Sequence, residues 1–277
     1  MSELLETLGG KTNIPAIILT CTKLGQSHAA NAAIAECFQS AVPTSAELMV
    51  PCAWSRDAAA RFTGYPMGVC LTLNAEFDNY RWGPITQAPS LLDGDGGFPR
   101  TPEDSWEHCD TDEVLRECRA QIERAAGWGC TITHLGTHMN TLLMRPEFFG
   151  AYLDLAIEMR LPVRLGSASQ ERRAGFPFRR LAAEAGVLAP DHSVNIGTTA
   201  IRQNLENLLE NLETQVTEIV LSPALDTPEL REMGPGWLQR VEQYLLLAHD
   251  EWLPNAIAKS GAQLFSFADL RQAQLNL

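Results

Sequence analysis

Two histidines at a regular spacing are the first side chains of this chain whose pattern indicates chemistry. His134 and His138 lie four residues apart at the end of a predicted strand, so their side chains share one of its faces. Two imidazoles on one face can bind a metal ion or move protons. The alternative is that one of them is a hydrogen-bonded histidine of the core. Both residues are therefore candidates for catalysis and for metal binding.

Lys23 and Cys70 are the other reactive candidates. Lys23 follows a predicted buried strand and is one of only three lysines, with Lys11 and Lys259. Lysine is rarely buried without a partner, so Lys23 is either a surface residue on a loop or a functional cation. Cys70 lies inside a predicted strand, where the alternatives are a small buried hydrophobe and a nucleophile or metal ligand.

Alternating strands and helices are expected to position these side chains. Short apolar runs predict strands at residues 14–22, 47–50, 67–73, 130–135, 162–165, 217–221 and 263–267. Amphipathic patterns predict helices from 27 and from 269, and at 55–62, 111–126, 147–159, 178–185, 201–212 and 237–250. Apolar strands separated by helices predict a parallel sheet covered on both faces. About seven such units favour a single-domain α/β barrel, a (β/α) barrel over residues 1–277.

In such a barrel the active site lies at the carboxyl ends of the strands, which adds further candidates. Thr22 and Ser222 each end a predicted strand, and we expect both to contact a substrate. Arg164 ends another strand. There it would bind a carboxylate or a carbonyl group of the substrate, or else pair with an internal acid such as Glu117.

A long segment without periodicity, residues 74–110, is predicted to be a loop at the barrel rim. It is rich in Gly, Pro, Asp and Trp, and a loop of this length inside a domain is usually functional. Tyr80 and Trp82 would offer flat apolar faces to a ligand, and Asp93 a polar group. Alternatively, Tyr80 and Trp82 anchor the loop to the rim.

The acidic balance of the chain argues against two classes of partner. Its 277 residues include 34 acidic and 21 basic side chains, a formal net charge of −13. Lysine and arginine must replace the counterions of a nucleic acid, and an anionic membrane surface repels an acidic chain. We therefore expect a small-molecule or carbohydrate ligand, with no nucleic acid and no membrane. Apolar stripes at residues 204–212 and 240–247 indicate barrel-facing packing, with a homodimer as the alternative.

Cysteine usage and the first residues point to a cytoplasmic protein. The seven cysteines are odd in number and lack CxxC spacing, as expected of free thiols in a reducing compartment. No positively charged start precedes an apolar stretch, and no apolar run reaches the ~18–20 residues of a membrane span. Neither a GxGxxG nor a P-loop pattern is present to indicate nucleotide binding.

Over nearly its whole length the chain resembles the YdjC/ChbG-like carbohydrate deacetylases. The resemblance lies in the order and spacing of short motifs, among them Gly-Val-Cys-Leu-Thr-Leu at 68–73 and Thr-His-Leu-Gly-Thr-His at 133–138. Further matching segments are residues 20–25, 81–84, 90–93, 96–98, 117–123, 161–164 and 237–240. The resemblance implies a NodB/YdjC-like (β/α) barrel, usually of seven strands. It also implies a divalent metal that activates water to remove an N-acetyl group from an amino sugar, the hydrolysis of a non-peptide C–N bond.

The chain departs from this family's pattern at the positions that carry the chemistry. The family's first strand ends in Asp-Asp-Phe-Gly, giving a general base and a metal ligand, where this chain has Thr22 and Lys23 before Leu-Gly. The family's metal-binding histidine in the third strand is Cys70, and the middle Asp of His-x-Asp-x-His is Gly136. The family's late His-Pro begins here with Ser222. The implied Asp-His-His site has become Lys-Cys-His.

Three hypotheses follow from these departures. In the first, no cofactor is bound, metal-dependent deacetylation is lost or weak, and Lys23 stands near the former position of the metal in a retained sugar-sized pocket. In the second, Cys70 with His134 or His138 forms a thiolate–imidazole nucleophile for a repurposed hydrolase or acyl-transfer enzyme. In the third, Cys21, Cys70, His134 and His138 form a soft-ligand metal site, which suits zinc better than magnesium.

Overall fold

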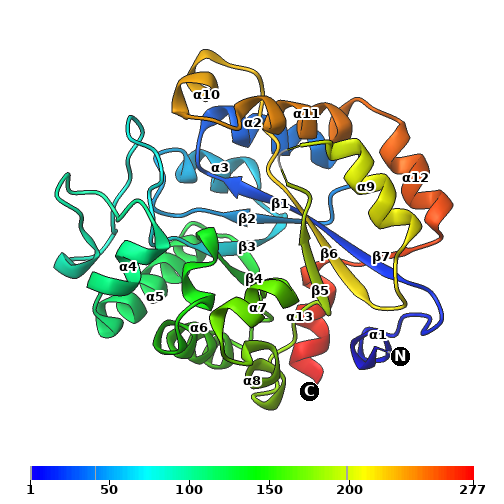
Figure 1. Cartoon of the computed structure of the whole chain (residues 1–277), viewed down its shortest axis with the longest axis horizontal. Coiled ribbons are helices and arrows are strands. Elements are labelled where there is room, and N and C mark those ends of the chain that lie inside the picture. Colours follow the sequence, from blue (N-terminus) through cyan, green and yellow to red (C-terminus); the bar gives the residue numbers. More distant parts are fainter. Residues whose placement is uncertain (1, 41, 198) are drawn as a thin grey trace.

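Seven parallel strands form the centre of the molecule, and helices cover the sheet on both sides (Figure 1). The computed structural model describes residues 2–40, 42–197 and 199–277. The strands run in the order β4-β3-β2-β1-β6-β5, and β7 pairs with the start of β1. Their bounds are β1 Ala16–Leu24, β2 Ser45–Leu48, β3 Pro66–Leu71, β4 Thr131–Thr137, β5 His192–Asn195, β6 Val216–Leu221 and β7 Gln263–Leu264. The α/β fold with a seven-stranded parallel sheet is confirmed.

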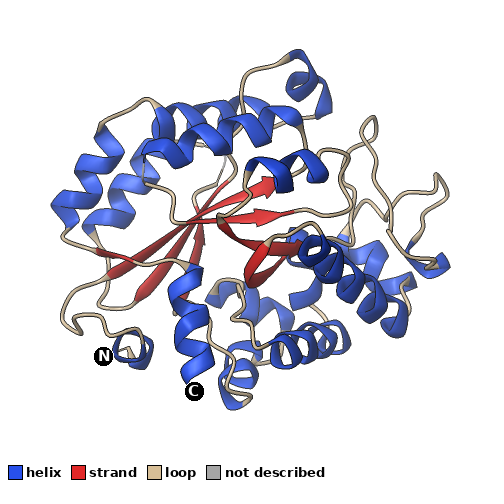
Figure 2. Ribbon diagram, turned by 180° about the vertical axis from the view of Figure 1, so that it is seen from behind, coloured by secondary structure: helices blue, strands red, loops and turns tan. Residues whose placement is uncertain are grey.

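The helices lie in two groups, with α2, α9 and α11 along one side of the sheet and α5, α6 and α8 along the other (Figure 1). The same two layers are visible from behind in Figure 2. The helices are α1 Glu3–Thr7, α2 His28–Cys37, α3 Ser55–Arg61, α4 Pro102–His108, α5 Thr111–Gly127, α6 Pro146–Met159, α7 Ala168–Ala174, α8 Phe178–Glu184, α9 Ile201–Glu210, α10 Pro228–Met233, α11 Trp237–Ala248, α12 Trp252–Ser260 and α13 Phe267–Asn276. Three 3₁₀ segments, η1 Phe38–Ser40, η2 Pro89–Leu91 and η3 His138–Leu143, complete the set.

The central strand β1 is apolar on both faces because both are covered. Ile17 and Leu19 point into the main core, which the outer helices share. Ile18 points to the other face and packs with Leu5 of α1 and Phe267 of α13. This two-sided burial explains why β1 is a continuous apolar run rather than an alternating one.

The sheet curls so that its two ends approach each other. The segment after α6 joins the β4 end through one bridge, Leu135 to Val163. Arg164 of that segment lies 4.0 Å from Glu218 of β6, near the opposite end of the strand order. A residue at one end of the order can reach a strand near the other end only if the sheet curves, which is the form expected of a barrel.

Several short elements differ from the sequence-based expectations. The predicted strand at 162–165 contributes only the Val163 bridge, while β5 was not predicted because its sequence, His-Ser-Val-Asn, is polar and half exposed. The predicted rim loop at 74–110 contains two short helices, η2 and α4. Over the described residues, no helix combines the length and the apolar character that a bilayer crossing requires. All seven cysteines are free thiols.

Candidate functional site

A β-bulge at the end of β1 places the Lys23 side chain. Between Cys21 and Leu24 the register of β1 against β2 gains one residue. Lys23 takes the left-handed backbone conformation, with φ of 67°. This conformation costs roughly 1–2 kcal/mol for a residue other than glycine. Bulges of this kind re-aim side chains near functional sites, and backbone strain concentrates at such sites.

Lys23, Glu76 and His138 form a hydrogen-bonded group at this edge of the sheet. The Lys23 Nζ donates to Glu76 Oε1 at 3.3 Å, and His138 Nε2 lies 2.8 Å from Glu76 Oε2. Their side chains are 27%, 18% and 6% exposed, so the group is only partly open to solvent. It lies at the carboxyl ends of the strands, which we call the mouth of the sheet. Burial raises the pKa of Glu76, but His138 and Lys23 outweigh it and hold that pKa well below its ordinary value. Burial lowers the pKa of Lys23, and Glu76 opposes this.

Arg240 of α11 lies beside this group. Its Nε donates to the carbonyl of Ser222 at 3.0 Å, and its Nη1 to Gln26 Oε1 at 2.8 Å. Its Nη2 is buried and has no hydrogen-bond partner among the described residues. Burial lowers the pKa of Arg240 to about 10. A hydrogen bond of 2.7 Å joins Thr22 Oγ1 and Ser222 Oγ near the carboxyl ends of β1 and β6.

A cavity of about 270 Å³ opens onto these side chains. Lys23, Glu76 and Arg240 supply its charged wall. The rest of its lining is apolar or small, namely Phe77, Leu230, Met233, Gly234, Pro235 and Trp237. Drug-sized ligands occupy pockets of roughly 300–1,000 Å³, so this cavity suits a single small molecule or one sugar unit.

His134 belongs to a different, fully buried group inside the sheet. Its Nε2 lies 3.2 Å from Glu47 Oε1, and its ring stacks on Phe267 with centroids 3.6 Å apart. Arg164 donates to both Glu47 oxygens at 2.8 Å, from Nε and Nη2. Burial raises the pKa of Glu47, but Arg164 and His134 bring it down to about 2. Burial raises the pKa of Glu218 to about 7, an effect that Arg164 only partly offsets.

The buried group thus separates the two predicted histidines. His138 lies at the mouth with Glu76, whereas His134 is a hydrogen-bonded core histidine, the alternative that its position left open. Arg164 pairs with an internal acid, but this acid is Glu47 and not the expected Glu117. Glu117 instead accepts hydrogen bonds from the backbone of Ile85 and Thr86 in the rim loop.

Two glycines make room for the buried group. A Cβ at Gly136 would collide with the Glu47 carboxylate, and a Cβ at Gly68 would collide with the His134 ring. The Glu47 carboxylate from β2 therefore occupies the space that a side chain at position 136 of β4 would fill. The chain thus has a buried acid next to Arg164 although position 136 carries no side chain.

Cys70 is close to the buried group but is not arranged as a nucleophile. It is 3% exposed, and its thiol makes no hydrogen bond to His134 or His138 among the described contacts. Burial and the neighbouring Glu47 raise the pKa of Cys70 far above its ordinary value. A thiolate is the reactive form, so this environment gives the nucleophile hypothesis little support.

The donor set at the mouth does not fit the divalent metal that the family resemblance implies. Within residues 2–40, 42–197 and 199–277, no three His, Cys, Asp or Glu side chains gather in a way that could hold a metal ion. Glu76 and His138 offer two donors, but the third group beside them is the Lys23 ammonium. A charged ammonium has no lone pair to donate and repels a cation.

Tyr80 and Trp82 hold the rim loop in place. Trp82 is buried, donates from Nε1 to the carbonyl of Asn74 at 2.8 Å, and has its ring centroid 6.2 Å from that of His138. The Tyr80 hydroxyl donates to the carbonyl of Gln26 at 2.5 Å. These contacts match the anchoring role that was the alternative to ligand stacking, although Trp82 still borders His138.

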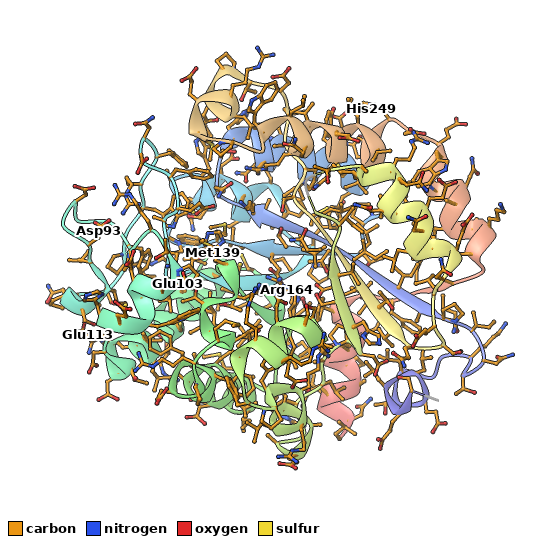
Figure 3. All side chains as sticks on the ribbon, viewed as in Figure 1. Asp93, Glu103, Glu113, Met139, Arg164 and His249 are labelled. Carbon is orange, nitrogen blue, oxygen red and sulfur yellow. The ribbon has the colours of Figure 1, made fainter. Side chains whose placement is uncertain are left out.

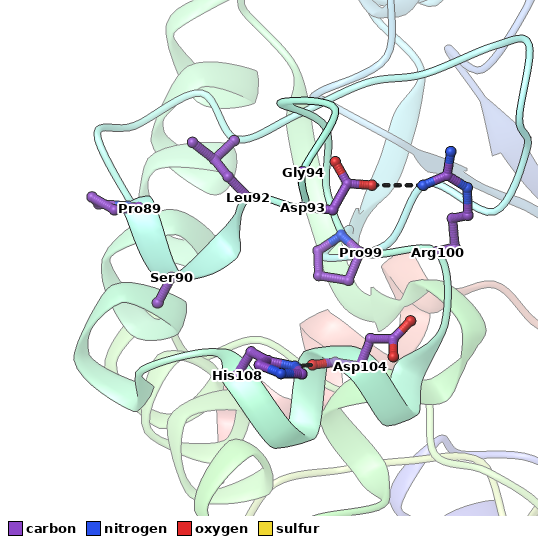
Figure 4. Close-up of a pocket in the computed structure, with 9 residues that line it drawn as sticks. All are labelled: Pro89, Ser90, Leu92, Asp93, Gly94, Pro99, Arg100, Asp104 and His108. Carbon is purple, nitrogen blue, oxygen red and sulfur yellow. Dashed lines mark hydrogen bonds and ion pairs between the residues drawn. The ribbon is translucent and has the colours of Figure 1, made fainter.

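Among the other hollows, two border residues predicted to belong to the site. One, of about 450 Å³, lies within the rim loop, between its residues 89–100 and α4, where Asp93 pairs with Arg100 (Figure 4). The other, of about 420 Å³, borders Arg164 with Ser193 and Asn195. Figure 3 shows Arg164 over the middle of the sheet and Asp93 far out on the rim loop.

Sequence reasoning missed Glu47, Glu76, Glu218 and Gln26 as site residues and treated Arg240 only as part of a motif. Glu47 and Glu218 carried a usable signal, because each is an acid inside an apolar strand, where charges are rarely buried unless paired. Glu76 carried none, since it follows β3 in a segment without periodicity.

Comparisons with known proteins agree with the fold and the motifs. The family described as YdjC-like protein matches residues 16–255. The chain is 32% identical over 255 residues to the carbohydrate deacetylase of Thermus thermophilus, covering 90% of this chain and 92% of the relative. It is 28% identical over 253 residues to that of Geobacillus stearothermophilus, covering 91% and 96%.

A solved structure shares the fold. It is the crystal structure of a protein from Enterococcus faecalis V583 that is named for cellobiose-phosphate cleavage. The two structures superpose with a TM-score of 0.82 at 23% identity, over 93% of this chain and 99% of that chain. This likeness shows the fold, and the family is shown by the match over residues 16–255 and by the 32% identity to the Thermus thermophilus relative. This chain belongs to the YdjC-like protein family and is a homologue of carbohydrate deacetylases.

Proposed function

We propose that this chain binds an acetylated amino sugar or a similar small molecule at the strand ends and has lost most or all metal-dependent deacetylation. The observation that carries this proposal is the Lys23–Glu76–His138 group. One carboxylate and one histidine at the mouth are bonded to each other, and an ammonium group takes the third place. The fold and the cavity of about 270 Å³ support a retained ligand.

Electrostatics explains why a metal would bind poorly here. Two unit charges 4 Å apart repel by about 4 kcal/mol at an effective dielectric constant of 20, so a divalent ion beside Lys23 would meet about twice that. Glu76 is a poor replacement for the missing general base, because its low pKa makes it a weak proton acceptor.

A second candidate is a repurposed hydrolase or acyl-transfer enzyme. The bond between His138 Nε2 and Glu76 at 2.8 Å favours it, because a carboxylate that orients a histidine is the arrangement of a general base. The proposed nucleophile of this candidate is Cys70, whose raised pKa weighs against it. A zinc site at Cys70, His134 and His138 has less support, since His134 faces Glu47 inside the sheet.

Metal analysis together with a deacetylation assay tests the proposal. The protein is purified without added metals, its metal content is measured by mass spectrometry, and acetate release from acetylated chito-oligosaccharides is followed with and without Mg²⁺ or Zn²⁺. The Thermus thermophilus relative serves as the positive control. We expect far less than one metal ion per chain and no metal-stimulated acetate release. One bound ion per chain, with turnover abolished by His138→Ala, would overturn the proposal.

The remaining expectations are also proposals. We expect a small-molecule or carbohydrate partner rather than nucleic acid or a membrane surface, because the net charge of −13 opposes both. The cytoplasmic location, which the free cysteines favour, and the homodimer stay predictions.

A further inference from the structure

We infer that the Lys23 cavity takes a small carboxylate, whose anionic group lies between Lys23 Nζ and Arg240 Nη2. This inference rests on the proposed function in that it assigns a ligand class to the same cavity. This carboxylate would belong to a sugar acid or to another small molecule with a flat apolar face. The anion would lie where relatives of this chain are expected to hold a metal cation, so the charge of the bound species would be reversed.

The first observation is an unused donor. Arg240 is 9% exposed and lines the cavity, yet its Nη2 has no partner among the described residues. The neighbouring Gln26 is fully buried; its Oε1 accepts from Arg240 Nη1, and its Nε2 has no partner among the described residues. A buried N–H without a partner costs about 1–3 kcal/mol, and a ligand oxygen would remove that cost.

The second observation is the charge of the cavity wall. Lys23 and Arg240 contribute two positive charges and Glu76 one negative charge. Arg240 and Lys23 also repel each other, since the Arg240 charge lowers the pKa of Lys23. The charged side chains that line the cavity therefore carry an excess of one positive charge, in a protein whose net charge is −13.

A single excess charge favours a monoanion. A carboxylate carries one negative charge and balances the wall, whereas a phosphate monoester near pH 7 carries close to two and would meet Glu76 at short range. Arg240 already donates from Nε and Nη1 within the protein, so Nη2 is its one nitrogen without a partner among the described residues.

The apolar wall indicates the rest of the ligand. Phe77, Met233 and Trp237 contribute apolar side chains to the lining of the same cavity. The Lys23 Nζ lies 5.9 Å from the centre of the Phe77 ring, so the ammonium and the aromatic face border the same space. A sugar ring or another flat apolar face would pack there while its carboxylate meets the two cations.

Lysine NMR gives a direct test, because the chain has only three lysines. The full-length protein is labelled with ¹³Cε-lysine, and Lys11→Arg and Lys259→Arg identify the Lys23 signal. Benzoate is titrated as the carboxylate probe, benzamide as its neutral match, and phenyl phosphate as the dianion. We expect benzoate alone to shift the Lys23 signal saturably, with a Kd at least ten-fold below those of the other two probes.

Variants separate binding at this cavity from binding elsewhere. Arg240→Gln should weaken benzoate at least ten-fold, and Arg173→Gln, in the hollow beside Arg164, should not change it. If Arg240→Gln fails to fold, Lys23→Gln measured by calorimetry gives the same comparison. Equal affinity for benzoate and benzamide, tighter binding of phenyl phosphate, or an unchanged affinity in Lys23→Gln would each overturn the inference.

The outcome also separates this inference from the proposed function. Binding of acetylated chito-oligosaccharides without any preference for benzoate would sink the carboxylate assignment and leave the proposed function standing. Metal-dependent deacetylation by a protein that still binds benzoate at Lys23 would do the reverse.

Discussion

At the residue scale, the buried acid beside Arg164 depends on a glycine of another strand. The Glu47 carboxylate occupies the space that a side chain at Gly136 would need, and it contacts both Arg164 and His134. An isolated buried charge is costly, so Glu47 needs Arg164 beside it and also needs the space that Gly136 leaves open. Glu47 and Gly136 are therefore expected to be coupled in stability.

A swap of the acid tests this coupling. Gly136→Asp alone should collide with Glu47, place two acids together and destabilise the fold, and Glu47→Gly alone should cost about 3–5 kcal/mol because Arg164 loses its partner. The double variant restores one acid beside Arg164 and should recover about half of the summed loss. Urea unfolding of the four proteins measures this, and strictly additive losses would contradict it.

Glu218 predicts a pH dependence of stability with a defined sign. Its folded pKa of about 7 lies above the ordinary value of 4.5, so the folded state binds the proton more tightly than the unfolded state. Stability from this group is therefore present below pH 4.5 and is lost as the pH rises to 7. The free energy of unfolding of Glu218→Gln, minus that of wild type, should therefore be larger at pH 8 than at pH 5 by on the order of 2 kcal/mol.

Thermal or urea unfolding at pH 5 and pH 8 measures this difference. The matched control is Glu184→Gln, whose side chain is exposed on α8 and which should follow the wild-type pH profile. Parallel profiles for wild type and Glu218→Gln would show that Glu218 is ionised throughout this range.

At the element scale, the strand ends at the mouth are irregular. Lys23 ends β1 in a left-handed bulge, and Met139 and Asn140 follow β4 with φ of 53° and 59°. Short apolar runs in the sequence predict the strands β1 and β4, but they carry no information on where a bulge interrupts a strand. The direction of the Lys23 side chain was therefore open until the backbone was known.

The strain at Met139 predicts a stabilising substitution. Glycine has no Cβ and adopts positive φ freely, so Met139→Gly should raise the free energy of unfolding by about 1 kcal/mol. Met159→Gly, the same exchange at the last residue of α6, where the backbone is helical and the side chain packs against the core, should lower it by roughly 1 kcal/mol. Chemical denaturation distinguishes the two, and a loss of stability in both would contradict the assigned strain.

At the scale of the whole molecule, the parallel α/β fold was predictable and the site was only partly so. Strand–helix alternation is a property of local sequence, and it predicted the sheet. The pairing of Lys23 with Glu76 joins residues 53 positions apart through the curl of the sheet, which no local pattern records. Both histidines were candidates at the end of one predicted strand; His138 lies beside Glu76, whereas His134, four residues earlier, faces Phe267 and Glu47.

The central claim is that a lysine charge occupies the place of a metal, and metal titration calorimetry tests it most directly. Wild type, Lys23→Asp/Cys70→His and the control Lys259→Asp are each titrated with Zn²⁺ and Mg²⁺. The account predicts no saturable binding by wild type or the control, and binding of about one ion per chain by the double variant, whose acid and histidines resemble the family set. Tight one-to-one binding by wild type, unchanged when Lys23 and Cys70 are replaced, would contradict the account.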